Sequence, residues 1–185
     1  MLYLASQSPR RRELLAQVGE GHDTLHVDVE EIRQAGESPD AYVSRVARDK
    51  ALAGLAEVAG ENDARILGAD TEVVLDDEVF GKPRDAVDAA AMLRRLSGRE
   101  HRVVSVVWLV SAAGEQHASS VSTVRFAPLP DEVITAYVAT GEWSGKAGGY
   151  AIQGAAAAFI EHLSGSYSGV MGLPLHETCT LLRSQ

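Results

Sequence analysis

The chain has 185 residues, of which 45% are hydrophobic and 23% are charged, and its formal net charge is −9. These proportions are typical of a globular protein and exclude a disordered tail, and the lack of any apolar run of about 18 residues excludes a membrane-spanning helix. The acidic charge balance argues against a nucleic-acid-binding protein, because such a protein needs a broad basic surface.

The chain begins with a short apolar stretch followed by charged residues. This order is the reverse of a secretory signal, so we expect a cytoplasmic protein. Residues 2–6 are predicted to form a buried strand, and Ser8 with the proline after it indicates the start of a helix. After a polar, irregular stretch over 19–37, the same signature at Ser38 starts a second helix, which should end near Gly60.

The middle of the chain alternates between predicted strands and a helix. Apolar runs rich in β-branched residues indicate the strands, and turn residues between them indicate hairpins. The expected elements are a buried strand at 64–70, a hairpin over 71–83 that turns near Asp76-Asp77, a helix at 85–96, and paired strands at 101–111 and 119–126. Hairpins exclude a purely parallel sheet, so the predicted fold class is α/β with a mixed sheet.

The last part of the chain contains a glycine-rich stretch. We expect a short helix after Pro130, glycine-rich residues over 141–154, a strand at 156–163 and a closing helix over 172–183. Cys179 lies on an apolar face of that helix and is interpreted as a packing residue, and a single cysteine excludes an intramolecular disulfide and a multi-cysteine zinc site. No repeat or linker divides the chain, so we expect one domain over 1–185, with two lobes around a cleft as a variant of this arrangement.

Three arginines, Arg10, Arg11 and Arg12, follow Ser8 in the first turn of the first helix. The backbone N–H groups there are unpaired and the helix dipole is positive, so cations are unfavourable unless an anion binds. In a chain of net charge −9, this arrangement suggests a phosphate-binding turn. A solvated basic turn with surface ion pairs is the alternative.

Acidic residues form a second candidate site. Asp70 is expected to end a buried strand, where open α/β sheets commonly place ligands, and Asp28, Glu30 and Glu31 lie between the first two helices. Carboxylates beside phosphate suggest a Mg²⁺ site or a base that deprotonates water. Spacing alone favours the simpler interpretation, a helix cap for Asp70 and solvated charges in the loop.

Two lysines, Lys50 and Lys82, and the glycines of 148–154 form the third candidate. Taken alone, the lysines are typical of solvated side chains and the glycines of a turn. No P-loop and no G-x-G-x-x-G motif is present, so neither a Walker-type kinase nor a Rossmann cofactor site is indicated. The histidines lack ligand spacing, and His162 and His176 are interpreted as structural or surface residues.

The chain contains several short motifs in an order that resembles the Maf family of nucleotide pyrophosphatases. Members of this family are also described as septum-formation inhibitors. The motifs are S-Q-S-P-R-R, V-E-E, A-R-D-K-A, G-A-D-T, G-K-P, K-A-G-G-Y-A-I-Q-G and G-L-P. They extend from the start of the chain into its closing helix. No single motif is decisive, whereas seven in the family's order are highly specific.

The resemblance implies a fold similar to the inosine-triphosphate pyrophosphatases, with an elongated mixed sheet, flanking helices and a central cleft. It implies hydrolysis of nucleoside triphosphates between the α- and β-phosphates, a divalent cation such as Mg²⁺ or Mn²⁺, and a homodimer. Such enzymes are viewed as house-cleaning enzymes, and their overproduction is associated with arrested septation. The implied site residues are Asp70 as general base, metal ligand or both, Glu31 as metal ligand, and Ser8, Arg11, Lys50 and Lys82 around the triphosphate.

The family that this chain resembles has two specificity branches, which differ in the residues at three positions. The pyrimidine branch carries Arg, Thr and Gln, matched here by Arg10, Thr71 and Gln153, whereas the 7-methylguanosine triphosphate branch carries an aromatic residue, Gln and Glu. A Gln amide donates and accepts, which suits O4 and N3–H of uracil or thymine, whereas a carboxylate only accepts and suits guanine. We therefore predict dTTP and UTP as substrates, with modified pyrimidines such as 5-methyl-UTP left open.

Two other functions stay open at this point. A non-catalytic, nucleotide-sensing regulator of septation fits the association with division, although such a protein does not need Asp70 as a base. A nucleic-acid-binding protein that uses the arginine turn fits those three cations but not the net charge of −9.

Overall fold

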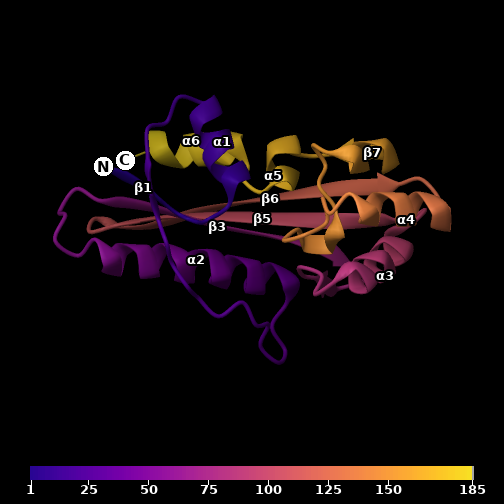
Figure 1. The fold of residues 1–185 in the computed structure, drawn as a ribbon. Helices are drawn as coiled ribbons and strands as arrows, with labels where there is room; N and C mark the ends of the chain where they lie inside the picture. The colour runs from indigo at the N-terminus through magenta and orange to yellow at the C-terminus, as the bar shows by residue number, and fades with distance from the viewer. Residues whose placement is uncertain (185) are drawn as a thin grey trace.

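The computed structural model of the chain describes residues 1–184 and confirms the predicted mixed α/β fold with flanking helices (Figure 1). The strands are β1 (Leu2–Ala5), β2 (Asp23–Leu25), β3 (Arg65–Leu75), β4 (Glu78–Phe80), β5 (Glu100–Ser111), β6 (Gly114–Phe126) and β7 (Ile160–Ser164). The helices are α1 (Pro9–Gln17), α2 (Pro39–Glu57), α3 (Ala86–Leu96), α4 (Asp131–Ala139), α5 (Tyr167–Met171) and α6 (Leu175–Arg183), with 3₁₀ turns at Ala147–Gly149 and Ala155–Phe159.

All the strands belong to one elongated sheet. The order is β2-β1-β3-β5-β6-β7, and β4 pairs with β3 outside this path. β1 pairs in parallel with β2 and β3, whereas every other pairing is antiparallel. The long strands β3, β5 and β6 connect two groups of helices, and the two hairpins predicted from the sequence account for the β3–β4 and β5–β6 pairings.

Helices cover both faces of the sheet (Figure 1). At the end that carries both termini, α2 packs on β3 and β5 from one side, and α1 and α6 lie on the other side. At the opposite end, α3 and α4 pack around a cluster that includes Leu93, Phe126 and Tyr137. Burying one large apolar side chain of this kind contributes about 1.5–3 kcal/mol. Among residues 1–184, no helix combines the length and apolar character that a bilayer crossing needs.

Local capping rules place the helix starts correctly. Ser38 Oγ accepts a hydrogen bond from Ala41 N at 3.2 Å, as its Ser-Pro signature predicts. Ser8 occupies the N-cap position of α1, but its side chain forms no capping hydrogen bond. The predicted hairpin turn is also confirmed, because Asp76 and Asp77 both adopt positive φ between β3 and β4.

Several element boundaries differ from the sequence predictions. The strand predicted to end at Asp70 continues to Leu75, because β5 pairs along it from Arg65 to Val74. Part of the stretch predicted to be irregular forms β2, which gains its hydrogen bonds from β1. Residues 155–159 form a 3₁₀ turn rather than the start of β7, and α5 precedes the closing helix. The first two differences depend on a strand partner distant in the sequence.

One edge of β3 is left open in the middle of the sheet. β1 pairs with β3 as far as Gly68, opposite Ala5, and β4 begins its pairing at Val73. Within the described chain, β3 residues 69–72 therefore have a strand partner only on the β5 side. An open edge of this kind leaves backbone and side chains accessible to a ligand. Asp70 lies inside this gap rather than at the end of a strand.

Candidate active site

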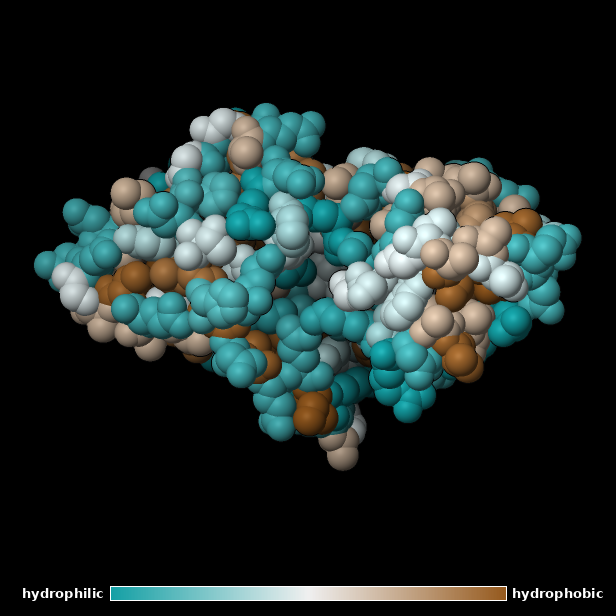
Figure 2. All heavy atoms as spheres, in the orientation of Figure 1, coloured by the Kyte–Doolittle hydropathy of each residue, from teal (hydrophilic) through white to brown (hydrophobic). Residues whose placement is uncertain are grey.

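A cleft of about 640 Å³ opens at the unpaired segment of β3. Figure 2 shows the molecule hollowed near its middle, with hydrophilic residues along much of the border. The volume lies within the range of about 300–1,000 Å³ that small-molecule sites occupy. The lining comes from residues 5–11, 27–29, 70–73, 144–147 and 170–172, together with Glu31, Lys50, Lys82, Val103 and Tyr150.

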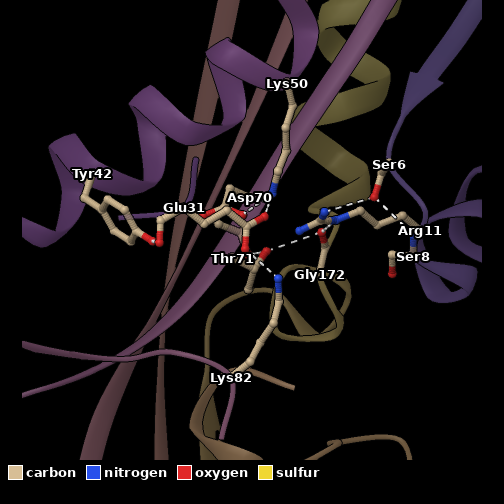
Figure 3. Close-up of polar contacts among 11 residues, drawn as sticks. Ser6, Ser8, Arg11, Glu31, Tyr42, Lys50, Asp70, Thr71, Lys82 and Gly172 are labelled. Atoms are coloured by element: carbon tan, nitrogen blue, oxygen red, sulfur yellow. Dashed lines mark hydrogen bonds and ion pairs between the residues drawn. The ribbon is translucent and has the colours of Figure 1, made fainter. Parts of the chain in front are cut away.

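A chain of ion pairs crosses this cleft (Figure 3). Lys50 Nζ, on α2, lies 2.8 Å from Asp70 Oδ1 and 2.6 Å from Glu31 Oε1. Lys82 Nζ, which follows β4, lies 2.6 Å from Glu31 Oε2. Burial disfavours the Glu31 carboxylate, but Lys50 and then Lys82 outweigh it and lower the pKa of Glu31 to about 2. Glu31 is therefore ionised at neutral pH and holds the two ammonium groups together.

The arginine turn is anchored to the segment between α5 and α6. Arg11 is buried, and it donates from Nε to the Gly172 carbonyl at 2.7 Å and from Nη1 to Ser6 Oγ at 3.2 Å (Figure 3). Arg10 Nε donates to the Met171 carbonyl at 3.0 Å. A solvated basic turn therefore does not describe Arg11, which lies in the cleft wall, and burial lowers its pKa.

Successive side chains of β3 point to opposite faces of the sheet. Asp70 lies on the face covered by α2, where it meets Lys50. Thr71 lies on the other face, with its Oγ1 2.7 Å from Ser105 Oγ and 3.3 Å from the Gly172 carbonyl oxygen. Because the strand edge is open here, the cleft includes side chains from both faces.

Glu72 is a buried carboxyl group in the cleft that the sequence patterns did not single out. Glu72 is 6% exposed and Asp70 5% exposed. Within residues 1–184, Glu72 Oε2 and Asp70 Oδ2 are buried without a hydrogen-bond partner. Burial, with the Asp70 charge as the next cause, raises the pKa of Glu72 to about 8. Its signal was its position two residues after Asp70, which on a strand places both on one face.

The glycine-rich stretch contributes the wall that contains Lys146 and Tyr150. The Tyr150 hydroxyl lies 2.9 Å from Nε2 of His101 on β5. Burial lowers the pKa of His101 to about 4, so its ring is neutral at pH 7. Gly148 has a positive φ, and a Cβ there would lie 2.8 Å from Val73 Cγ2, so only glycine lets this loop approach β3 so closely.

Comparison with known proteins identifies the family. The model of a family described as Maf-like protein matches residues 1–185. The chain belongs to the Maf family.

Relatives and solved structures resemble the chain to different degrees. A Maf relative named dTTP/UTP pyrophosphatase from Xanthomonas euvesicatoria pv. vesicatoria (strain 85-10) is 60% identical over 184 residues, which cover 98% of this chain and 97% of the relative. One of the same name from Cupriavidus metallidurans is 53% identical over 191 residues, covering 99% and 96%. The structure of the Staphylococcus aureus Ham1 protein matches with a TM-score of 0.45 and 11% identity, covering 68% of this chain and 71% of that one.

The Maf resemblance read from the motif order is thus confirmed, and most of the residues it implied lie together. The structure brings to the cleft Ser8, Arg10, Arg11, Glu31, Lys50, Asp70, Thr71 and Lys82. Gln153 is exposed and is not among the described residues that line the cleft. Asp28 lines the cleft as well, whereas Glu30 does not.

Proposed function

We propose that this Maf-family chain hydrolyses dTTP and UTP between their α- and β-phosphates. The products are the nucleoside monophosphate and pyrophosphate, and the reaction removes these nucleotides from the pool. The observation that carries the proposal is the contact of Lys82, Glu31, Lys50 and Asp70 in one cleft, at 2.6–2.8 Å. The relatives named dTTP/UTP pyrophosphatase, at 53–60% identity, support the choice of substrates.

The cationic side chains supply the triphosphate site. A triphosphate carries about four negative charges near neutral pH, and Lys50, Lys82 and Arg11 offset part of them with charge-assisted hydrogen bonds. Glu31 already holds both lysine ammonium groups at 2.6 Å, so phosphate oxygens entering the cleft take the place of this carboxylate. Positive charge fixed in this way stabilises the pyrophosphate leaving group as its charge develops.

Asp70 is the group to which we assign activation of the attacking water. Lys50 binds its Oδ1 and fixes the carboxylate, while Oδ2 is buried without a hydrogen-bond partner within the described chain, in a residue that lines the cleft. A water between Oδ2 and the α-phosphorus transfers its proton to Asp70 as its oxygen attacks in line with the leaving pyrophosphate.

A divalent cation, Mg²⁺ or Mn²⁺, fits the donors of this cleft. Among residues 1–184, no three His, Cys, Asp or Glu side chains converge on one point. Mg²⁺ in nucleotide enzymes commonly uses only one or two carboxylates and takes its other ligands from phosphates and water. Asp70 offers an unpartnered buried oxygen, and Glu31 becomes available once phosphates occupy its lysines. When bound, such a cation polarises phosphate oxygens.

We assign recognition of the substrate's nucleobase to Arg10, Thr71 and Gln153. Arg10 and Thr71 line the cleft, which supports their roles, whereas Gln153 lies outside its lining and its role stays a prediction. An amide that donates and accepts matches the edge shared by uracil and thymine. Modified pyrimidine nucleotides such as 5-methyl-UTP carry the same edge and remain candidate substrates.

We further propose one domain of two lobes that associates as a homodimer. The continuous strands β3, β5 and β6 support the single domain. The outer edge of β6 supports association, because β7 pairs only with residues 123–126 and no other described strand covers residues 114–122 on that side. Sedimentation of the purified protein tests this, and a monomer at micromolar concentration contradicts it.

Pyrophosphate release by the purified protein tests the activity. The panel contains dTTP, UTP, CTP, dATP, GTP and 7-methyl-GTP, each with Mg²⁺ or Mn²⁺. Release from dTTP and UTP that falls by about 100-fold or more in Asp70→Asn is the expected result. Preference for 7-methyl-GTP over both, or no release from any nucleotide, would overturn the proposal.

The same variant distinguishes the enzyme from a regulator. If overproduced Asp70→Asn protein still arrests division, that effect does not require hydrolysis, and a nucleotide-sensing role gains support. If arrest disappears together with pyrophosphate release, the effect follows from catalysis.

A further inference from the structure

We propose that Glu72 is a second protein ligand of the divalent cation, so that Asp70 and Glu72 hold it from one face of β3. This inference rests on the proposed function for the cation's role, and it adds a residue that neither the motifs nor the family resemblance indicated. It concerns the free protein, before nucleotide enters the cleft.

The geometry of the strand places the two carboxylates together. Residues two apart on a strand lie on the same face at about 6–7 Å, a separation that two carboxylate side chains span when they share one ion. Both residues line the cleft at the open edge of β3, where no described strand covers them. Asp70 and Glu72 therefore both belong to the wall of the cleft that a cation would enter.

Each of the two carboxyl groups has one buried oxygen without a hydrogen-bond partner among the described residues. Asp70 Oδ2 and Glu72 Oε2 are buried and accept no hydrogen bond from residues 1–184, although the two residues are 5% and 6% exposed. A buried carboxylate oxygen without a donor is costly, because it loses its water and gains no partner. A divalent cation satisfies both oxygens at once and offsets the repulsion that arises when both carboxyl groups are ionised.

Glu31 is occupied in the free protein. Its two oxygens contact Lys50 Nζ and Lys82 Nζ, each at 2.6 Å, and no such ion pair ties Glu72. Lys50 also takes Asp70 Oδ1 but leaves Oδ2. Among the described residues that line the cleft, the unpartnered buried oxygens thus belong to Asp70 and Glu72, so cation binding without nucleotide depends on Glu72.

Mn²⁺ binding without nucleotide tests the inference, followed by electron paramagnetic resonance of free Mn²⁺ and by calorimetry. The proteins are the wild type, Glu72→Gln, Glu72→Asp and a matched control, Glu30→Gln, which removes an exposed carboxylate outside the cleft lining. We expect Glu72→Gln to weaken binding at least tenfold, Glu72→Asp to retain part of the affinity, and Glu30→Gln to bind as the wild type does.

Stability supplies a second measurement. Because Glu72 Oε2 has no partner, Glu72→Gln should melt no lower than the wild type in the presence of a chelator, while gaining less thermal stability from Mn²⁺. Mn²⁺ affinity and Mn²⁺-induced stabilisation equal to those of the wild type would overturn the inference. Lost pyrophosphate release with intact Mn²⁺ binding would also overturn it, and would assign Glu72 a proton-transfer role instead. Failure of the wild type to hydrolyse any nucleotide concerns the proposed function alone.

Discussion

Replacing Gly68 by alanine tests whether the close packing of α2 on β3 positions Lys50 in the cleft. A Cβ at Gly68 would overlap the Ala47 carbonyl oxygen and lie 2.6 Å from Ala51 N, both in the backbone of α2. Opening the second contact alone to an ordinary 3.4 Å moves α2 by about 0.8 Å, and the tighter contact with the Ala47 carbonyl oxygen requires a larger shift. Lys50 precedes Ala51, so this shift displaces the backbone that carries its Nζ, which lies 2.8 Å from Asp70 Oδ1, and strains that contact.

The expected cost follows from these distances. Overpacking of a core costs about 1–3 kcal/mol, and backbone neighbours that cannot rotate away place Gly68→Ala near the upper value. Urea unfolding measures this change, and pyrophosphate release should fall about 100-fold because a shift near 1 Å misplaces the catalytic group. Gly60→Ala is the control, since nothing lies within 4 Å of its added Cβ. Wild-type stability together with wild-type release in Gly68→Ala would refute the reasoning.

Two further predictions concern buried titratable groups. The raised pKa of Glu72 means that the folded state keeps a proton which the unfolded chain loses, so this group contributes stability below about pH 4.5 that is lost as the pH rises to about 8. Glu72→Gln should therefore gain stability over the wild type by up to about 1.4 kcal/mol per pH unit within that window, in urea unfolding with chelator present; parallel pH profiles would contradict this. Tyr150→Phe removes the hydroxyl beside His101, whose Nδ1 already lacks a partner within residues 1–184, and should destabilise the fold by about 1–3 kcal/mol. Thermal unfolding measures this loss, and an unchanged melting temperature would show that the pair does not anchor the loop.

Elements set by local signals were predictable from the sequence. The Ser38-Pro39 pair marks the start of α2 because the Ser38 hydroxyl caps a backbone N–H three residues later. The turn at Asp76-Asp77 follows from residues that tolerate positive φ. Strand 2–5 and the helices at 86–96 and 175–183 lie within the predicted ranges for the same reason, since their apolar patterns are local.

Elements set by distant partners were not predictable in this way. β3 passes through Asp70 because β5 pairs beyond that residue, which a window around 64–70 does not reveal. β2 has three residues, and its hydrogen bonds come from β1, about twenty residues earlier. Residues 155–159 have the apolar character of a strand, yet they form a 3₁₀ turn before β7.

The features of the candidate site can likewise be separated into those that the sequence indicated and those that depend on the tertiary structure. Motif order determined the family and the set of charged residues in the cleft, and the arginines at a helix start indicated an anion. In the segment G-A-D-T-E, Glu72 follows Asp70 by two positions, so on a strand both side chains lie on the same face of the sheet. The arginine turn and the spacing of Asp70 and Glu72 depend on residues that are neighbours in the chain, and the motif order is a property of the sequence itself.

The tertiary structure decided which charges meet. Lys82 and Glu31 are 51 positions apart, and Lys50 and Asp70 are 20 apart, yet all four join across the gap that β1 and β4 leave along β3. It also decided that Gln153 lies outside the cleft lining and that Arg11 is buried against Gly172. Such contacts follow from strand pairing and helix packing over long sequence separations, which local residue preferences do not specify.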